Sequence, residues 1–155
     1  MGVSVCVNPP DLQDVLRREI PAAAVLGVSV HQSFPNIVLA APLAQNRNGL
    51  GIAFAGSLNT VLVLSGWLTL YSHLCDRGRW PTRIVLQDSA IHYLAPVPGD
   101  FLATCEAPEP AEWDRILRVV ARNRPARVSL AAHLAPRDNP GVVAARFTGR
   151  YVVGG

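Results

Sequence analysis

One stretch of the chain, residues 48–75, reads NGLGIAFAGSLNTVLVLSGWLTLYSHLC and contains no Asp, Glu, Lys or Arg. Arg47 and Asp76 bound it on either side. Its glycines lie at the front and a run rich in Leu and Val follows, so we expect a helix from Ser57 to Cys75. A helix that is apolar on nearly every side is typical of a domain interior. The stretch therefore predicts a buried central helix around which the other segments fold.

The length of this stretch also raises the question of a membrane-spanning helix, which needs about 20 apolar residues. Its polar side chains argue against a membrane span, because a bilayer would leave each of them without water as a partner. They are Asn48, Ser57, Asn59, Thr60, Ser65, Thr69, Ser72 and His73. We therefore expect no membrane contact.

Composition indicates one domain that is partly covered by a second copy of itself. A chain of 155 residues can bury a core, and we expect a single domain over residues 1–155. Residues 1–10 are expected to be a frayed N-terminal segment. Only 16% of the residues are charged, which is a low fraction for a monomer and suggests that a second copy covers part of the surface. Cys6, Cys75 and Cys105 show neither disulfide nor zinc spacing. Since the N-terminus also lacks a secretory pattern, we expect reduced thiols in a cytoplasmic protein.

The segments on either side of the helix show strand-like or helical patterns. Residues 11–20 place their apolar side chains on one helical face between two prolines. The long strand predicted at 82–97 changes the parity of its apolar positions near Asp88 and Ser89, which indicates a bulge. The other predicted elements are strands at 27–32, 36–41, 101–107, 126–135 and 142–153, and a helix at 110–123. This order predicts an α+β domain in which one antiparallel sheet wraps a long central apolar helix.

Two motifs in this order resemble a known family. AQNRNGLGIAFAGSL (44–58) opens the helix, and IVLQDSAIHYLAPVPGD (84–100) follows it. The matching residues are Asn46, Asn48, Gly51, Ala53, Phe54, Gly56, Ser57, Leu58, Gly66, Trp67, Asp88, Ser89, Ile91, Tyr93, Leu94, Pro96, Val97, Gly99 and Asp100. On these residues the chain resembles the hot-dog fold and, within it, the thioesterase-like YiiD C-terminal-domain family, which is related to malonyl-acyl-carrier-protein decarboxylases. It departs from that family at Ile52, where Thr is common, and at Ala55, where a second Gly is common.

The resemblance implies a homodimer whose two sheets join, with acyl-thioester sites at the subunit boundary. Pantetheine of coenzyme A or of an acyl carrier protein would enter between the protomers, in fatty-acid or polyketide metabolism. We expect thioester hydrolysis, with decarboxylation of malonyl-acyl carrier protein or a related malonyl thioester as the alternative. The departures at Ile52 and Ala55 leave a non-catalytic acyl-thioester binding module as a second alternative. Nucleic acid is not an expected partner, because no recognised motif is present.

The start of the helix and the loop before it supply three candidate catalytic residues, Asn48, Gly56 and Ser57. The unpaired N–H groups and positive dipole end of a helix N-terminus suit a thioester oxygen as it gains charge, and glycine permits close approach. The Asn48 amide can donate to the same oxygen, and Asn46 is predicted to contact substrate beside it. Alternatively, Ser57 is only an N-cap and the two asparagines only form turns.

The central helix lacks the carboxylate that many hot-dog hydrolases use, since Asn59, Thr60 and Val63 occupy the region. Hydrolysis needs a base for water, whereas decarboxylation needs an oxyanion donor and a desolvated carboxylate. We expect Asp88, partly buried on its strand, to serve as a catalytic base, or otherwise to be a structural carboxylate at the bulge. The remaining predicted substrate contacts are Phe54, Asn59, Thr60, Ser89, His92 and Tyr93.

Arg118 and Arg122 belong to a series of arginines between residues 115 and 127. We predict that they contact the phosphates of coenzyme A or the acidic face of a carrier protein. The alternative is an ordinary solvated helix face. The four histidines have no metal-ligand spacing, so neither a metal nor another cofactor is expected.

Overall fold

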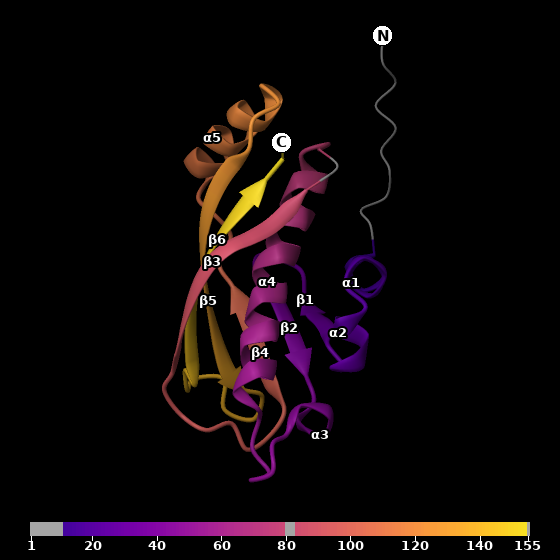
Figure 1. Cartoon of the computed structure of the whole chain (residues 1–155), viewed down its shortest axis with the longest axis vertical. Helices are drawn as coiled ribbons and strands as arrows, with labels where there is room; N and C mark the ends of the chain where they lie inside the picture. Colours follow the sequence, from indigo (N-terminus) through magenta and orange to yellow (C-terminus); the bar gives the residue numbers. More distant parts are fainter. Residues whose placement is uncertain (1–10, 80–82, 155) are drawn as a thin grey trace.

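The strands form one antiparallel sheet that curls around a single long helix (Figure 1). The computed structural model describes residues 11–79 and 83–154, so the predicted lead at 1–10 lies outside the described residues. The strand order is β1-β2-β4-β5-β6-β3, which makes β1 and β3 the edges. The bounds are Ser29–Gln32 (β1), Ile37–Ala41 (β2), Ile84–Tyr93 (β3), Phe101–Cys105 (β4), Ala126–Pro136 (β5) and Ala145–Val153 (β6). The predicted α+β class and central helix are confirmed.

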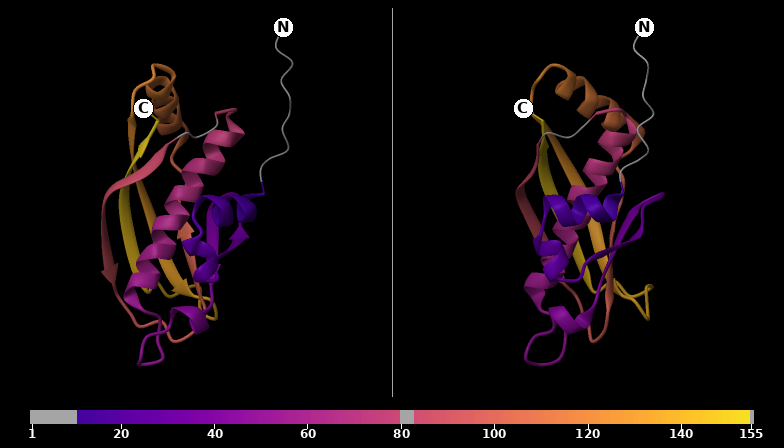
Figure 2. Two further views of the ribbon diagram at one scale, coloured as in Figure 1. Left: turned by 45° about the vertical axis from the view of Figure 1, so that its right-hand side comes forward. Right: turned by 90° about the vertical axis from the view of Figure 1, so that its right-hand side faces the viewer.

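The central helix, α4, spans Ala55–Asp76 and lies between the sheet and the N-terminal helices (Figure 2). Its buried hydroxyl groups bond within the helix: Ser65 Oγ donates to the Leu62 carbonyl at 2.7 Å, and Thr69 Oγ1 donates to the Ser65 carbonyl at 2.8 Å. The helix therefore adds no unpaired hydroxyl at these positions to the core. In the described part of the chain, no helix combines the length and apolarity that crossing a membrane requires.

Residues 11–79 and 83–154 also contain four shorter helices: α1 (Leu12–Glu19), α2 (Ala22–Val25), α3 (Leu43–Asn46) and α5 (Pro110–Ala121). The Asp11 carboxylate caps α1 by accepting from two backbone N–H groups of the first turn. The four-residue helices α2 and α3 were not predicted. Neither has a side-chain cap at its N-terminus, so the sequence gives no start signal for them.

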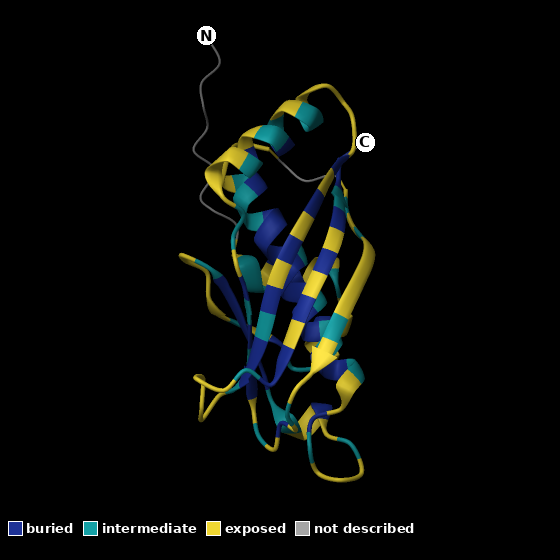
Figure 3. Cartoon of the chain, turned by 90° about the vertical axis from the view of Figure 1, so that its left-hand side faces the viewer, coloured by how far each residue is buried: buried dark blue, intermediate teal, exposed yellow. Residues whose placement is uncertain are grey.

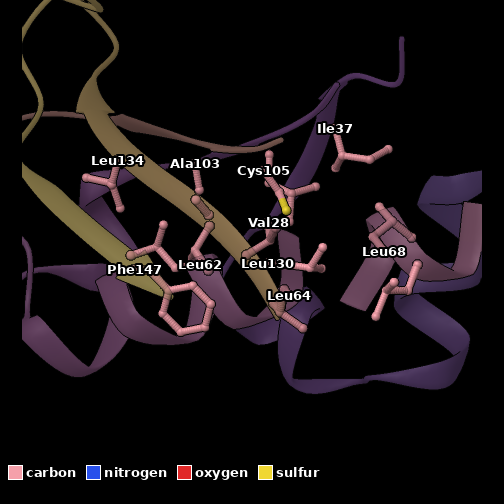
Figure 4. Close-up of a cluster of buried hydrophobic side chains, with 14 of the residues drawn as sticks. Val28, Ile37, Leu62, Leu64, Leu68, Ala103, Cys105, Leu130, Leu134 and Phe147 are labelled. Atoms are coloured by element: carbon pink, nitrogen blue, oxygen red, sulfur yellow. The ribbon is translucent and has the colours of Figure 1, made fainter. Parts of the chain in front are cut away.

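Residues of β5 and β6 alternate between the helix side and the outer side of the sheet (Figure 3). On the helix side, Leu130 and Phe147 pack in a buried cluster with Leu62 and Leu134 (Figure 4). Tyr151 also points toward α4, and its hydroxyl donates to the Val63 carbonyl at 2.8 Å. Burial raises the pKa of this hydroxyl well above its usual value. The core thus lies between the sheet and α4.

Edge strand β3 pairs only with β6 among the described strands, and its register shifts between Leu86 and Asp88. This bulge is the one that the change of parity predicted. Beyond it, Ser89 stands opposite the buried Gly149, whereas Asp88 stands opposite the exposed Arg150. Ser89 and later alternate residues of β3 therefore face the helix side, and Asp88 faces the outer side.

Candidate functional site

The loop before α4, the start of α4 and the end of β3 enclose an open hollow of about 360 Å³. Its lining includes Asn48, Ala55, Leu58, Tyr93 and Val97. The backbone closes this region: the Ala53 N–H donates to the Val97 carbonyl at 2.8 Å. The hollow is therefore built from three segments that the sequence motifs had singled out. Leu58 and Val97 were matching residues in those motifs but had no predicted role in the site.

A larger hollow, of about 450 Å³, lies elsewhere, between α1, the β1–β2 connection and the end of α4. Asp11, Phe34 and Asp76 are among its lining residues. We do not place the site there, because Asp11 is already committed to capping α1 and Asp76 lies at the carbonyl end of α4. Neither feature favours an acyl thioester, whose oxygen needs hydrogen-bond donors as it gains negative charge.

The first turn of α4 presents free backbone donors. The N-cap is Phe54, which supplies no side-chain acceptor, and the first bond of the helix runs from the Leu58 N–H to the Phe54 carbonyl at 3.1 Å. The N–H groups of Ala55, Gly56 and Ser57 have no acceptor in the part of the chain that the structure describes. Ser57 is the third residue of the helix and is buried, so the alternative in which it caps the helix is wrong.

Gly56 leaves room for the exposed Phe54 ring to lie against the first turn of α4. The Phe54 ring lies against it, and a Cβ added to Gly56 would come within 2.5 Å of a ring carbon. The Gly56 carbonyl accepts from Thr60 Oγ1 at 2.8 Å, which occupies the Thr60 hydroxyl within the helix. Asn59, the next residue toward the N-terminus, has a buried Oδ1 without a hydrogen-bond partner among the described residues.

Asn48 is held in the loop by its acceptor oxygen. Asn48 Oδ1 accepts from the Leu50 N–H at 2.8 Å and from the Ile52 N–H at 3.4 Å, as in an Asx turn. Because the oxygen faces these two N–H groups, the orientation of the amide is fixed. Its Nδ2 donor makes no bond to any described residue, and the side chain lines the hollow. Asn48 therefore combines both readings of the sequence: it forms the turn and leaves one amide donor free.

Asn46, by contrast, uses its amide hydrogens inside the chain. It is buried, and its Nδ2 donates to the Leu26 carbonyl at 2.8 Å and the Pro42 carbonyl at 2.7 Å. Its backbone carbonyl accepts from the Phe54 N–H at 2.7 Å. These bonds fix the loop against the body of the protein and leave no Asn46 N–H for a substrate.

Tyr93 joins the end of β3 to the start of α4. Its hydroxyl donates to the Ala55 carbonyl at 2.9 Å, while 47% of the residue remains exposed beside the hollow. Tyr93 therefore lies beside Ala55 at the start of α4 and lines the same hollow as Asn48. Ser89 shares the helix-facing side of β3, but it lies four residues before Tyr93, is exposed and is not among the residues that line the hollow.

Asp88 and His92 lie on the opposite side of the sheet. Asp88 is ion-paired with Arg150, whose Nε lies 2.9 Å from its Oδ2, and His92 stands opposite Arg146. The Asp88 side chain is 54% exposed in the single chain, so the expectation of partial burial is wrong. The reason is the bulge, since an extra residue moves the following side chain to the other face. Neither residue reaches the hollow of its own chain.

Arg118 and Arg122 are exposed on α5, at the far end of α4 from the hollow (Figure 1). The Arg118 Nε donates to the Asp114 carbonyl at 3.3 Å. A helix of 22 residues such as α4 is about 33 Å long, so these arginines cannot contact a thioester-bound group at the hollow of the same chain. The structure separates them from the other predicted site residues within one chain.

The thiols and possible metal ligands form no second site among residues 11–79 and 83–154. Burial raises the pKa of Cys105 to about 11 and also raises the pKa of Cys75, so both thiols are held in the unreactive protonated form. No group of three or more His, Cys, Asp or Glu side chains in these ranges is placed to hold a metal ion. The third cysteine, Cys6, lies outside the described residues.

Comparison with known proteins bears on the fold and the family. A family model described as "Putative thioesterase (yiiD_Cterm)" matches residues 10–154. A protein of unknown function from Chlorobaculum tepidum TLS is 25% identical, with a TM-score of 0.85 over 92% of this chain and 91% of that chain. The putative thioesterase from Shewanella oneidensis is 28% identical, with a TM-score of 0.82 over 93% and 95%. A probable thioesterase from Pseudomonas aeruginosa shares the fold at 18% identity, with a TM-score of 0.75 over 92% and 93%.

Proposed function

This chain belongs to the YiiD_C putative thioesterase family and has the hot-dog fold, and from that premise we propose that it hydrolyses acyl thioesters of coenzyme A or of an acyl carrier protein. The observation that carries the proposal is a set of free donors at the start of α4, of which Asn48 and Ala55 line the hollow. The backbone N–H groups of Ala55, Gly56 and Ser57 and the Nδ2 of Asn48 lie around the start of α4 and have no acceptor among the described residues.

These donors suit the chemistry of a thioester carbonyl. Attack on that carbon turns the carbonyl oxygen into an oxyanion, and the free N–H groups together with the helix dipole stabilise negative charge at that position. The donors are already fixed, since Asn48 is bound through its Oδ1 and Gly56 is packed under Phe54. They therefore need little reorganisation as charge develops.

Hydrolysis also requires a base for water, and the described residues that line the hollow of one chain include no carboxylate. Asn48 is its most polar lining residue, and Asp88 faces the other side of the sheet. This observation favours a second candidate, decarboxylation of a malonyl thioester. There the bond between the α carbon and the carboxylate breaks, carbon dioxide leaves, and the electron pair forms an enolate whose oxygen the same donors hold. The enolate is then protonated at the α carbon by water.

We further propose that two copies join through edge strand β3 to form a homodimer. This strand is ten residues long, has one free edge and carries few charges, whereas exposed edges are usually protected by charges or proline. Large apolar side chains are also exposed on β3 and beside the start of α4: Leu50, Phe54, Val85, Tyr93 and Leu94. A second copy would cover these side chains. Two identical edge strands can pair antiparallel, because the backbone N–H groups of each copy then donate hydrogen bonds to the carbonyl groups of the other.

One assay separates the candidates. The protein is incubated with malonyl thioesters and with long-chain acyl thioesters, of coenzyme A and of acyl carrier protein, while free thiol and carbon dioxide are measured. Release of thiol supports hydrolysis, and release of carbon dioxide without thiol supports decarboxylation. Neither product, with binding retained, would show a non-catalytic binding module and would overturn the proposed enzyme.

A further inference from the structure

Two side-chain hydroxyl groups donate to backbone carbonyls in the first turn of α4. The Tyr93 hydroxyl, at the end of β3, donates to the Ala55 carbonyl at 2.9 Å, and Thr60 Oγ1 donates to the Gly56 carbonyl at 2.8 Å. Tyr93 and Thr60 were both predicted to contact substrate. In the structure, the hydrogen of each hydroxyl is bound to a peptide group at the start of the helix.

Each of these carbonyls belongs to a peptide group whose N–H is a free donor. The Ala55 carbonyl shares its peptide group with the Gly56 N–H, and the Gly56 carbonyl shares its peptide group with the Ser57 N–H. In a planar trans peptide the carbonyl and the N–H point in opposite directions. The two hydroxyls therefore hold these peptide groups from the carbonyl side and leave the N–H side open at the start of the helix.

A hydrogen bond to a carbonyl makes the N–H of the same peptide group a stronger donor. The bond draws electron density toward the carbonyl oxygen, so the N–H becomes more positive, and successive hydrogen bonds polarise one another in this way. The same bond also restrains the plane of the peptide group, which fixes the direction of its N–H. Both effects favour an N–H that is already directed at the position where negative charge develops.

The same kind of bond occurs further along α4, where it has no free donor to act on. Thr69 Oγ1 donates to the Ser65 carbonyl, and the Tyr151 hydroxyl donates to the Val63 carbonyl. The N–H groups of those two peptide groups lie in the middle of the helix, where each is bound to the carbonyl of the preceding turn. The start of α4 is therefore where such a bond can strengthen a donor that faces a ligand.

We propose that Tyr93 and Thr60 are positioning residues for the proposed reaction. Their hydroxyls orient and polarise the two consecutive peptide groups whose N–H groups, those of Gly56 and Ser57, hold the oxyanion. This inference rests on the proposed function and deepens it, since hydrolysis and decarboxylation both place negative charge on the thioester oxygen. A polarised donor stabilises that charge more than it stabilises the neutral carbonyl of the substrate, so the effect belongs to kcat rather than to KM.

Removal of each hydroxyl with little change of side-chain shape tests the proposal. One such bond strengthens the next by about 10–30%, and loss of a whole oxyanion donor lowers kcat by about 10²- to 10³-fold. We therefore expect Tyr93→Phe and Thr60→Val each to lower kcat by about twofold to eightfold, with KM close to the wild-type value. Thr60→Ser, which keeps the hydroxyl, should retain the wild-type kcat.

Tyr151→Phe and Thr69→Val are the matched controls, because each removes the same kind of bond further along α4. Both controls should keep the wild-type kcat. Urea unfolding checks that each test variant is at least as stable as its control, so that a lower kcat does not reflect partial unfolding. If Tyr93→Phe and Thr60→Val lower kcat no more than their controls do, the proposal is overturned.

Amide chemical shifts test the polarisation without turnover. A hydrogen bond to a carbonyl shifts the amide nitrogen resonance of the following residue downfield. In isotope-labelled protein we expect Tyr93→Phe to move the Gly56 nitrogen resonance upfield and to leave that of Ser57 in place, and Thr60→Val to do the reverse. If neither variant moves the resonance assigned to it, the two hydroxyls do not polarise the donors, whatever the protein turns over.

Binding keeps this inference separate from the proposed function, which fails if the wild type turns over no thioester. The probes are the S-carboxymethyl and S-carbamoylmethyl thioethers of pantetheine, which have nearly the same shape but present a charged and a neutral oxygen. Calorimetry should show that Tyr93→Phe weakens binding of the carboxylate by about twofold to eightfold and binding of the amide by less. Equal effects on the two probes would overturn the inference.

Discussion

At the scale of single residues, Gly66 sets how closely β6 packs on α4. A Cβ added there would overlap the Tyr151 hydroxyl, which donates to the Val63 carbonyl. We expect Gly66→Ala to lower the unfolding free energy by about 1–3 kcal/mol, although alanine is the better helix former by about 1 kcal/mol. Urea unfolding measures the change. Gly99→Ala, whose added Cβ meets nothing within 4 Å, is the control, and a Gly66→Ala protein as stable as wild type would contradict the packing argument.

Asn48 has two roles that a pair of substitutions can separate. Asn48→Asp keeps an acceptor for the Leu50 and Ile52 N–H groups but removes the Nδ2 donor, whereas Asn48→Ala removes both. We expect Asn48→Asp to reduce kcat by about 10²- to 10³-fold, the effect of removing one oxyanion donor, with an unfolding free energy within about 0.5 kcal/mol of wild type. Steady-state kinetics and urea unfolding measure the two effects. Turnover of Asn48→Asp at the wild-type rate would remove Asn48 from the site.

The contrast between Asn48 and Asp88 shows which site residues a sequence can predict. Asn48 lies eight residues before Gly56 in one motif, and the loop that joins them is short, so local sequence keeps them together. Whether Asp88 lies near the site depends on which face of β3 carries its side chain, and a register shift of one residue reverses that face. The change of parity predicted the bulge, but only the register against β6 places Asp88 opposite Arg150 on the outer side.

At the scale of elements, α5 packs on α4 through a contact whose stability we expect to depend on pH. Trp113 stacks on His73, and the pKa of His73 is lowered, first by burial and then by the Arg77 charge. The unfolded chain takes up a proton near pH 6.5, while the folded chain does so only at lower pH. Stability from this group is therefore complete above about pH 6.5 and falls as the pH drops below that value.

We accordingly expect the thermal midpoint of the wild type to decrease as the pH is lowered from about 7.5 to 5.5. The midpoint of His73→Gln should decrease less steeply over the same range. Scanning calorimetry across this range measures both slopes. His31→Gln, on the exposed strand β1, is the control and should keep the wild-type slope. Equal slopes for wild type and His73→Gln would show that the contact between α5 and α4 is not coupled to protonation of His73.

Among the elements, α4 could be predicted because its apolar run is long, while its first residue could not. The helix begins at Ala55 because the Phe54 carbonyl accepts its first bond, and Phe54 carries none of the side chains that mark an N-cap. Ser57, which does carry one, lies inside the helix instead. Helices α2 and α3 escape prediction because tertiary contacts, such as the Asn46 bonds to Leu26 and Pro42, hold segments too short for a helical period.

At the scale of the whole molecule, the proposed dimer joins features that one chain leaves apart. The free donors lie at one end of α4, Arg118 and Arg122 lie at its other end, and the free edge of β3 runs between them. The low fraction of charged residues in the sequence suggests a partner. The sequence could not show which strand forms the edge of the sheet, because strand order depends on pairings between distant segments. The order β5-β6-β3 is what leaves β3 outermost.

A charge placed in the middle of β3 tests the dimer directly. Ser89 is exposed, faces the helix side and lies near the centre of the strand, so antiparallel pairing about that centre brings the two copies of residue 89 close together. Ser89→Arg would then oppose like charges across the symmetry axis, and we expect sedimentation velocity to show a shift from dimer to monomer. Ser129→Arg makes the same change on the outer side of β5 and should remain dimeric. Circular dichroism checks that both variants fold. If folded Ser89→Arg sediments as the wild-type dimer, the two sheets do not join through β3.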